Sequence, residues 1–300
     1  MCLYPKIIKN PKYKENSKNK GIVKAPKNIK QLGIPVGCGK CIECRARKGR
    51  DWKIRLLEEV RERKNGKFVT FSFNDEGLKH YENKCKGLKG YELDNAVASV
   101  AIRRFTENWR KKYKKSPRHW FVTELGERGT ERIHIHGIIW TNRSEEEIAD
   151  RWRFSKQNSH ASQSVGFVYV GEYVNDRTVG YIVKYLHKAD IKHKEYVPKV
   201  FASKGIGSGY FRRSDWQRNI YNGRKTNETY RDRKGYKMAL PIYYRNKLYT
   251  EDQRENLWAY KIEEDTRYVM GKKIVNESSK EGKRIYRGAR EEASEARAAG

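Results

Sequence analysis

The chain has 300 residues, of which 67 are Lys or Arg and 37 are Asp or Glu, so its formal net charge at pH 7 is +30. This excess of positive charge predicts a polyanionic partner, usually a nucleic acid, with an acidic membrane surface as the weaker alternative. No run of 18 apolar residues is present, which excludes a membrane-spanning helix, and the N-terminus lacks the apolar region of a secretion signal.

A group of cysteines follows an N-terminal segment, residues 1–37, whose Lys, Asn, Gly and Pro content predicts an irregular basic arm. The spacing Cys38-x-x-Cys41-x-x-Cys44 supplies three thiolates close together. Tetrahedral zinc needs a fourth ligand, for which Cys2 is the first candidate and Cys85 the second. Free thiols and an iron–sulfur cluster are the alternatives to a structural zinc ion, and disulfides are disfavoured in a cytosolic protein.

Hydrophobic periodicity predicts a mixture of helices and strands up to residue 190. Neighbouring strands are joined by short turns, which favours an α+β fold with an antiparallel sheet. Residues 75–91 are polar and are expected to form a loop. The expected strands are 67–74, 119–125, 133–140 and 166–174, and the expected helices are 44–64, 93–113 with Asp94 as N-cap, a helix starting at the capping box Ser144–Glu147, and 176–188.

After residue 190 the sequence changes character. A glycine-rich segment at 205–210, without the ending of a nucleotide-binding phosphate loop, leads into a strongly basic stretch. Residues 236–248 are expected to form a strand or a basic aromatic binding segment, and 251–262 a helix; the charged, Ala-rich end beyond 275 is expected to be frayed or disordered. The chain is therefore expected to have three parts, 1–66, 67–190 and 191–300.

Two histidines stand out in the strand predicted at 133–140. His134 and His136 are separated by one apolar residue, so both side chains point to the same face of a sheet. Two neutral imidazoles placed in this way can share one divalent metal ion. The alternative is a surface strand with two exposed histidines.

Two tyrosines stand out in the helix predicted at 176–188. Tyr181 and Tyr185 are four residues apart and therefore neighbours on one helical face, and each is followed three residues later by a lysine, Lys184 and Lys188. A phenol can act as a covalent nucleophile when a base or a nearby cation stabilises its phenolate. Amphipathic packing of two tyrosines with solvated lysines is the alternative.

A carboxylate on a neighbouring strand would complete a three-ligand metal site with the histidines. Glu124 is the best candidate, because it ends the strand predicted to pair with the histidine strand, and paired residues lie only about 5 Å apart. Glu127 and Glu131 lie nearer in sequence, but in the turn between the strands.

These elements together resemble the HUH endonucleases, which comprise rolling-circle replication initiators, plasmid relaxases and related transposases. His134-Ile135-His136 matches the His-hydrophobic-His motif, Tyr181 and Tyr185 match the two-tyrosine pattern, and residues 68–74 look like the apolar first motif. The resemblance is closest to the initiators of gokushovirus-type microviruses, through the start Met1–Pro5, the segment Cys38–Arg45, Trp52 and Glu124-Leu125-Gly126. It covers roughly residues 1–190.

The resemblance implies a central antiparallel sheet flanked by helices and a site-specific endonuclease and ligase that initiates rolling-circle replication. It implies Mg²⁺ or Mn²⁺ at Glu124, His134 and His136, attack by Tyr181 or Tyr185, and a 5′-phosphotyrosyl link to the cut strand. Lys184 and Lys188 would stabilise charge during the reaction.

The expected partners are single-stranded DNA with its replication origin and a host DNA polymerase and helicase, and the expected location is the cytoplasm of a bacterial host. A transposase or relaxase is the rival with the same chemistry. A non-catalytic nucleic-acid-binding or packaging protein of a phage is the rival from another class, since charge and aromatic content fit it equally well.

Overall fold

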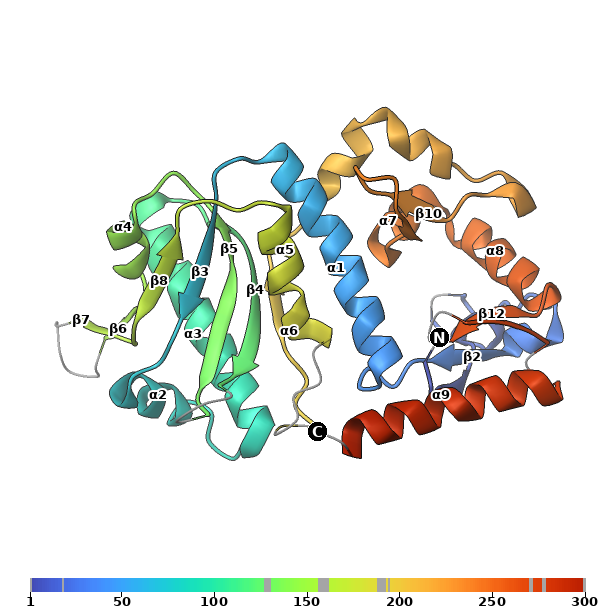
Figure 1. Ribbon diagram of the computed structural model, residues 1–300, viewed down its shortest axis with the longest axis horizontal. Coiled ribbons are helices and arrows are strands. Elements are labelled where there is room, and N and C mark those ends of the chain that lie inside the picture. Colours follow the sequence, from blue (N-terminus) through green and yellow to red (C-terminus); the bar gives the residue numbers. More distant parts are fainter. Residues whose placement is uncertain are drawn as a thin grey trace. The chain divides into compact units, whose positions relative to one another are not determined.

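The computed structural model describes residues 2–17, 19–126, 131–155, 162–187, 193, 195–269, 272–276 and 279–298 (Figure 1). The chain divides into two compact units. We call Trp52–Arg212 the sheet unit, and Met1–Asp51 together with Arg213–Gly300 the terminal unit. In the part of the chain that the structure describes, every helix is too short or too polar to cross a membrane.

The sheet unit is built on a five-stranded sheet with the order β8-β3-β5-β4-β9, in which all neighbouring strands are antiparallel. Helices flank this sheet, so the predicted α+β fold with a central antiparallel sheet is confirmed. The strands of the sheet are β3 Gly66–Phe71, β4 Arg118–Leu125, β5 Ile133–Trp140, β8 Val168–Gly171 and β9 Val200–Ala202. A separate short pair consists of β6 Arg153–Ser155 and β7 Ser162–Ser164.

Alternation along the strands produces two apolar layers. Val69, Phe71 and Ile135 point to one face, where they pack with Phe105 of α3. Trp120, Val122, Ile138 and Trp140 point to the other face and pack with apolar residues of α1, α5 and α6. Figure 1 shows α3 on one side of the sheet and α5 and α6 on the other. The helices are α1 Ile42–Glu62, α2 Asp75–Glu82, α3 Gly90–Tyr113, α4 Glu145–Ala149, α5 Asp176–Ile182 and α6 Lys184–His187.

A buried ion pair fastens α1 to β4. Glu59, whose side chain is 0% exposed, accepts hydrogen bonds from the guanidinium of Arg118 and, at 2.8 Å, from the backbone N–H of Gly207. Burial alone would raise the pKa of Glu59, but these hydrogen bonds outweigh it and hold the pKa below its usual value of 4.5.

Three expectations for the sheet unit are wrong in detail. The polar stretch 75–91 contains helix α2, because Asn74 caps it and Tyr81 buries its ring against the core. Helix α3 begins at Gly90 instead of near Asp94, with Lys89 as N-cap. The tyrosine helix is divided by Val183 into α5 and α6. The capping box of Ser144 and Glu147 is confirmed at α4.

The terminal unit joins the two ends of the chain. The expected irregular arm contains strands β1 and β2, which pair with each other, and the end expected to fray forms the long helix α9. The expected strand at 236–248 is only β11 followed by helix α7, and the helix expected at 251–262 is α8. The remaining bounds are β1 Lys6–Lys9, β2 Gly33–Val36, β10 Thr229–Arg231, β11 Lys237–Ala239, β12 Thr266–Val269, β13 Lys272–Val275, α7 Ile242–Leu248, α8 Glu251–Glu263 and α9 Lys280–Ala298, with short 3₁₀ helices at Pro11–Tyr13, Ile29–Leu32, Ser208–Arg212, Ser214–Asn219 and Gly223–Lys225.

Candidate active site

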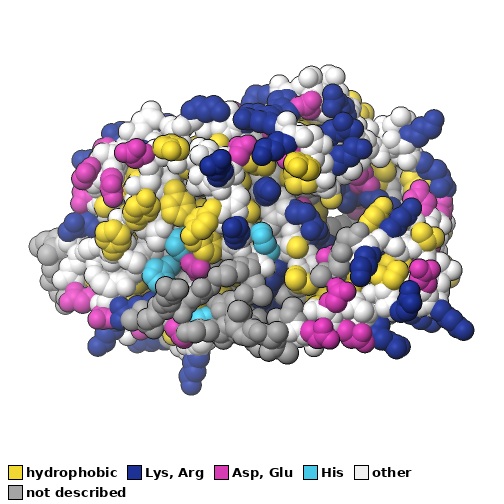
Figure 2. All heavy atoms as spheres, viewed as in Figure 1, with side chains coloured by type: hydrophobic (Ala, Val, Ile, Leu, Met, Phe, Trp, Pro, Cys, Tyr) yellow, Lys and Arg dark blue, Asp and Glu magenta, His cyan; other side chains and the backbone are white. Residues whose placement is uncertain are grey.

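The two histidines of β5 lie on the face of the sheet that α5 and α6 cover. Their neighbours Ile133 and Ile135 are buried in the opposite layer, whereas Ile138 and Trp140, further along the strand on the histidine face, pack under α5 and α6. His134 and His136 are half-buried. The space-filling view shows histidine side chains next to a group of hydrophobic side chains on this face (Figure 2).

His136 is held at both ring nitrogens. Its Nε2 lies 2.7 Å from Glu124 Oε2 on β4, and its Nδ1 lies 2.9 Å from Thr70 Oγ1 on β3. Thr70 is the direct strand partner of His136, so the register of β3 and β5 brings the hydroxyl to the ring. When Nδ1–H donates to this hydroxyl, the lone pair of Nε2 is left on the side of Glu124. Thr70 is a site residue that the sequence did not predict.

The donors fit a divalent cation in part. Octahedral Mg²⁺, with bonds of about 2.1 Å, places neighbouring donors about 3 Å apart, close to the distance between His136 Nε2 and Glu124 Oε2. His134 is the direct strand partner of Glu124, but its ring centroid lies 6.4 Å from that of His136. Among the described residues, the only His, Cys, Asp or Glu group with all ligand atoms within 4.8 Å is a set of cysteines. His134 would therefore have to turn its side chain to join the other two ligands.

His134 is in the right protonation state for a ligand. Burial lowers its pKa, and the neighbouring His136 lowers it further, while contacts with Arg132 and Glu124 oppose the shift only in part. A neutral imidazole is the form that binds a metal ion.

Of the three candidate carboxylates, Glu124 is the one at the histidines. Glu131 instead lies 3.3 Å from the ring nitrogen of His193. Glu127 lies outside the described residues.

The two tyrosines come together over His136. The ring of Tyr185 stacks on the imidazole of His136, with centroids 4.5 Å apart and an interplanar angle of 11°. The hydroxyl oxygens of Tyr185 and Tyr181 are 2.8 Å apart and share a hydrogen bond. Tyr185 is half-buried, and Tyr181 is 52% exposed. The break at Val183 thus leaves both phenols on one face, as the spacing of four residues predicts.

Local sequence explains why the tyrosines lie there. Asn175 caps α5 and forms a capping box with Thr178, which fixes where the helix begins. Val179, Ile182 and Leu186 are buried against the sheet and set the rotation of both short helices. Their partners on the sheet include Ile138, two residues along β5 from His136 on the same face.

The lysines predicted to assist the tyrosines are not placed beside them. Lys184 begins α6 with an exposed side chain. Adjacent helical residues point about 100° apart, so Lys184 does not share the face of Tyr185. Lys188 lies outside the described residues.

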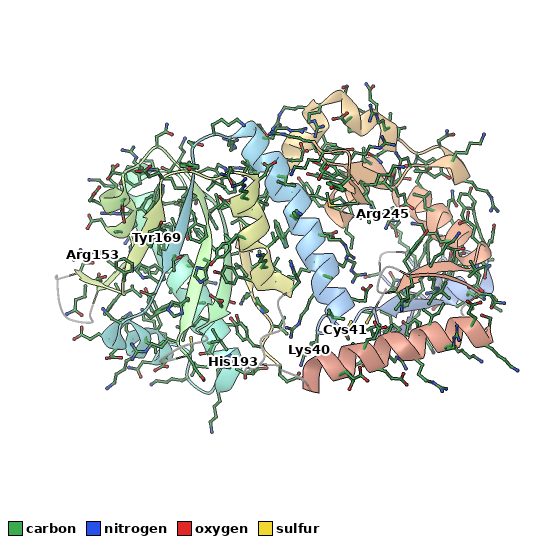
Figure 3. All side chains as sticks on the ribbon, in the orientation of Figure 1. Lys40, Cys41, Arg153, Tyr169, His193 and Arg245 are labelled. Carbon is green, nitrogen blue, oxygen red and sulfur yellow. The ribbon has the colours of Figure 1, made fainter. Side chains whose placement is uncertain are left out.

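An aromatic surface borders the site. We use this name for Phe68 together with Tyr169 and Tyr181, whose ring centroids lie 6.3 Å and 6.2 Å from that of Phe68. Tyr169, labelled on β8 in Figure 3, is 50% exposed. The surface therefore extends from the tyrosine pair across β3 to the edge strand β8.

The cysteines form a separate group in the terminal unit. The sulfur atoms of Cys2, Cys38, Cys41 and Cys44 all lie within 4.8 Å of one another. Cys85, the second candidate for the fourth position, belongs instead to the apolar core of the sheet unit. The structure therefore selects Cys2 as the residue that joins the other three.

Comparison with known proteins gives one match. Residues 66–190 match the model of a family described as replication-associated protein ORF2. The matched segment begins with β3 and includes Glu124, both histidines and both tyrosines, and it is less than half of the chain. No curated protein and no solved structure matches the chain. The family match supports the role of a replication initiator.

Proposed function

We propose that this protein starts rolling-circle replication by cutting and rejoining single-stranded DNA at an origin through a 5′-phosphotyrosyl intermediate. The observation that carries the proposal is the stack of Tyr185 on His136, whose Nε2 lies 2.7 Å from Glu124. A nucleophile is thereby adjacent to two of the three proposed metal ligands. Neither packing nor nucleic-acid binding alone requires this combination.

The proposed cleavage exchanges one phosphodiester for another. A phenol oxygen attacks phosphorus, the bond from phosphorus to the 3′ oxygen breaks, and one proton passes overall from the phenol to the leaving oxygen. The products are a phosphotyrosyl diester and a free 3′-OH that a polymerase can extend. Because a diester is retained, the reverse reaction rejoins the strand without ATP.

The tyrosine pair favours this step electrostatically. A hydroxyl can donate and accept, so either phenol can donate a hydrogen bond to the other when the latter loses its proton. Such a bond to a developing negative charge stabilises the transition state more than the ground state. With one tyrosine linked to DNA, the second remains available for another cleavage.

The proposed cofactor is Mg²⁺ or Mn²⁺, held by Glu124, His136 and a reoriented His134. Such an ion, when bound, polarises the scissile phosphate and neutralises part of its charge. Thr70 keeps the ring of His136 in the orientation and tautomer that the ligand needs.

Single-stranded DNA fits the surroundings of the site. The net charge of +30 favours a polyanion, and unpaired bases can stack on the aromatic surface formed by Phe68, Tyr169 and Tyr181. Bases in a duplex are already stacked and could not use these rings. The resemblance to gokushovirus-type initiators points to a phage origin as the substrate.

Incubation of the full chain with a single-stranded circle carrying the cognate origin and Mn²⁺ tests the proposal. We expect a covalent protein–DNA adduct on a denaturing gel, lost in chelator and lost when Tyr181 and Tyr185 are both changed to Phe. The matched control Tyr268→Phe, at an exposed tyrosine of the terminal unit, should leave the adduct unchanged. Tight DNA binding by the wild type without any adduct would favour the non-catalytic alternative instead.

A further inference from the structure

The four cysteines of the terminal unit form a preformed tetrahedral pocket. Zinc–thiolate bonds of about 2.3 Å place the sulfur atoms of a tetrahedral site about 3.8 Å apart. The sulfur atoms of Cys2 and Cys41 are 3.8 Å apart, and all four lie within 4.8 Å of one another. A disulfide would need about 2.05 Å, and all the cysteines carry free thiols.

Backbone N–H groups point at the sulfur atoms. The N–H of Cys38 and that of Tyr4 donate to Cys2 Sγ at 3.2 Å and 3.3 Å, and the N–H of Cys41 donates to Cys38 Sγ at 3.3 Å. Such donors stabilise the negative charge that thiolates keep when they bind a cation. Neutral thiols packed for their bulk alone would not require N–H groups aimed at sulfur.

Two glycines shape the pocket. Gly39, between the first two cysteines of the repeat, has a φ of +77°, a backbone conformation that other residues rarely adopt. A side chain at Gly37 would place its Cβ 3.0 Å from Cys44 Sγ. The first glycine lets the loop fold back on itself, and the second leaves room for the sulfur group.

The C-terminal helix closes the pocket. In α9, the hydroxyl of Tyr286 donates to the carbonyl of Cys2, and Arg290 Nε donates to the carbonyl of Leu3 at 2.9 Å. Ala289 of the same helix is buried in one apolar cluster with Cys2, Cys41 and Cys44. The four sulfur atoms are therefore covered by apolar groups and by a helix from the other end of the sequence.

We propose that Cys2, Cys38, Cys41 and Cys44 bind one structural zinc ion that ties the N-terminus to α9 and so holds the terminal unit together. Tetrahedral sulfur ligation suits zinc or iron. An iron–sulfur cluster would insert several atoms between the cysteines, whereas a sulfur separation of 3.8 Å fits a single ion. No substrate position is left open, since all four ligands are protein thiolates.

Elemental analysis of the full chain purified without chelators tests the metal itself. We expect about one zinc per chain and no stoichiometric iron. Replacement of zinc by Co²⁺ should give the intense visible absorption of a tetrahedral thiolate complex. Metal-free wild-type protein, or stoichiometric iron in place of zinc, would overturn the proposal.

Two serine variants test the ligands. Cys2→Ser should lower the zinc content at least about tenfold after dialysis against a competing chelator, because a three-thiolate site is left. The matched control Cys85→Ser, at a buried cysteine of the sheet unit, should keep its zinc. Equal zinc content in both variants would exclude Cys2 as a ligand.

Proteolysis tests the link to α9 without any variant. Release of zinc by a mercurial reagent should speed tryptic cleavage within 280–298, where basic residues are frequent, and leave cleavage within 52–126 unchanged. Equal cleavage of α9 with and without zinc would refute its role in holding the terminal unit together. None of these measurements involves DNA, so their outcome is independent of the proposed nicking activity.

Discussion

Replacing Thr70 with Val tests whether the hydroxyl beside His136 prepares this ring for metal binding. Valine keeps the size and the strand preference of threonine but loses the hydrogen bond of 2.9 Å to Nδ1. A half-buried N–H left without a partner costs about 1–3 kcal/mol. At about 1.4 kcal/mol per factor of ten, the metal concentration for half-maximal nicking should rise about 5- to 150-fold.

The assay is a titration of Mn²⁺ in the covalent-adduct reaction, repeated by calorimetry without DNA. At saturating Mn²⁺ the rate of Thr70→Val should approach the wild-type rate, because both nucleophiles are intact. Thr70→Ser should restore the wild-type titration, and Ser72→Ala, which removes a hydroxyl bonded to the carbonyl of Phe167, should not change it. An unchanged titration for Thr70→Val would refute this role of the hydroxyl.

Three further predictions concern the nucleophiles, the aromatic surface and stability. Tyr181→Phe and Tyr185→Phe should each leave some adduct, with Tyr185 the expected first attacker, and peptide mapping of the trapped adduct would contradict this if one tyrosine served every step. Tyr169→Ala should weaken single-strand binding about 5- to 150-fold, from about 1–3 kcal/mol per stacked base, in a fluorescence titration in which Tyr268→Ala has no effect. Glu59→Gln should lower the free energy of unfolding by about 2–3 kcal/mol, less than for a fully buried pair because Arg118 is partly exposed. Because the folded-state pKa of Glu59 lies below 4.5, its contribution is present above that pH and is lost below it, so unfolding curves of Glu59→Gln and wild type should converge in acid.

The candidate site residues were predictable because local periodicity places them. Alternation puts His134 and His136 on one face, and a spacing of four puts Tyr181 and Tyr185 on one face, whatever the rest of the chain does. Glu124 followed from one further step, the pairing of two adjacent strands. The divalent ion remains a prediction.

The residues that were missed depend on contacts between distant segments. Thr70 meets His136 only through the register of β3 and β5, which the sequence does not specify. Helix α2 was hidden because few of its residues are buried. The choice between Cys2 and Cys85 also required the fold, since the two differ in which part of the chain surrounds them.

Helix α9 shows a signal that was present but outweighed by composition. Ile285, Ala289 and Ala293 recur every four residues and pack on the cysteine group, although the segment around them is strongly charged. Charge content alone therefore predicted a frayed end where a narrow apolar stripe is sufficient for a helix.

The bonds between α9 and the N-terminal residues have a consequence for biosynthesis. The sheet unit is continuous in sequence, so it can fold while the ribosome is still making the rest of the chain. The terminal unit cannot, because Cys2 and Tyr286 are separated by 284 positions and the second is made close to the end of translation. During that interval the four thiols lack their helical cover, so metal supply and redox conditions in the cell at the moment of synthesis decide how much of this unit forms correctly.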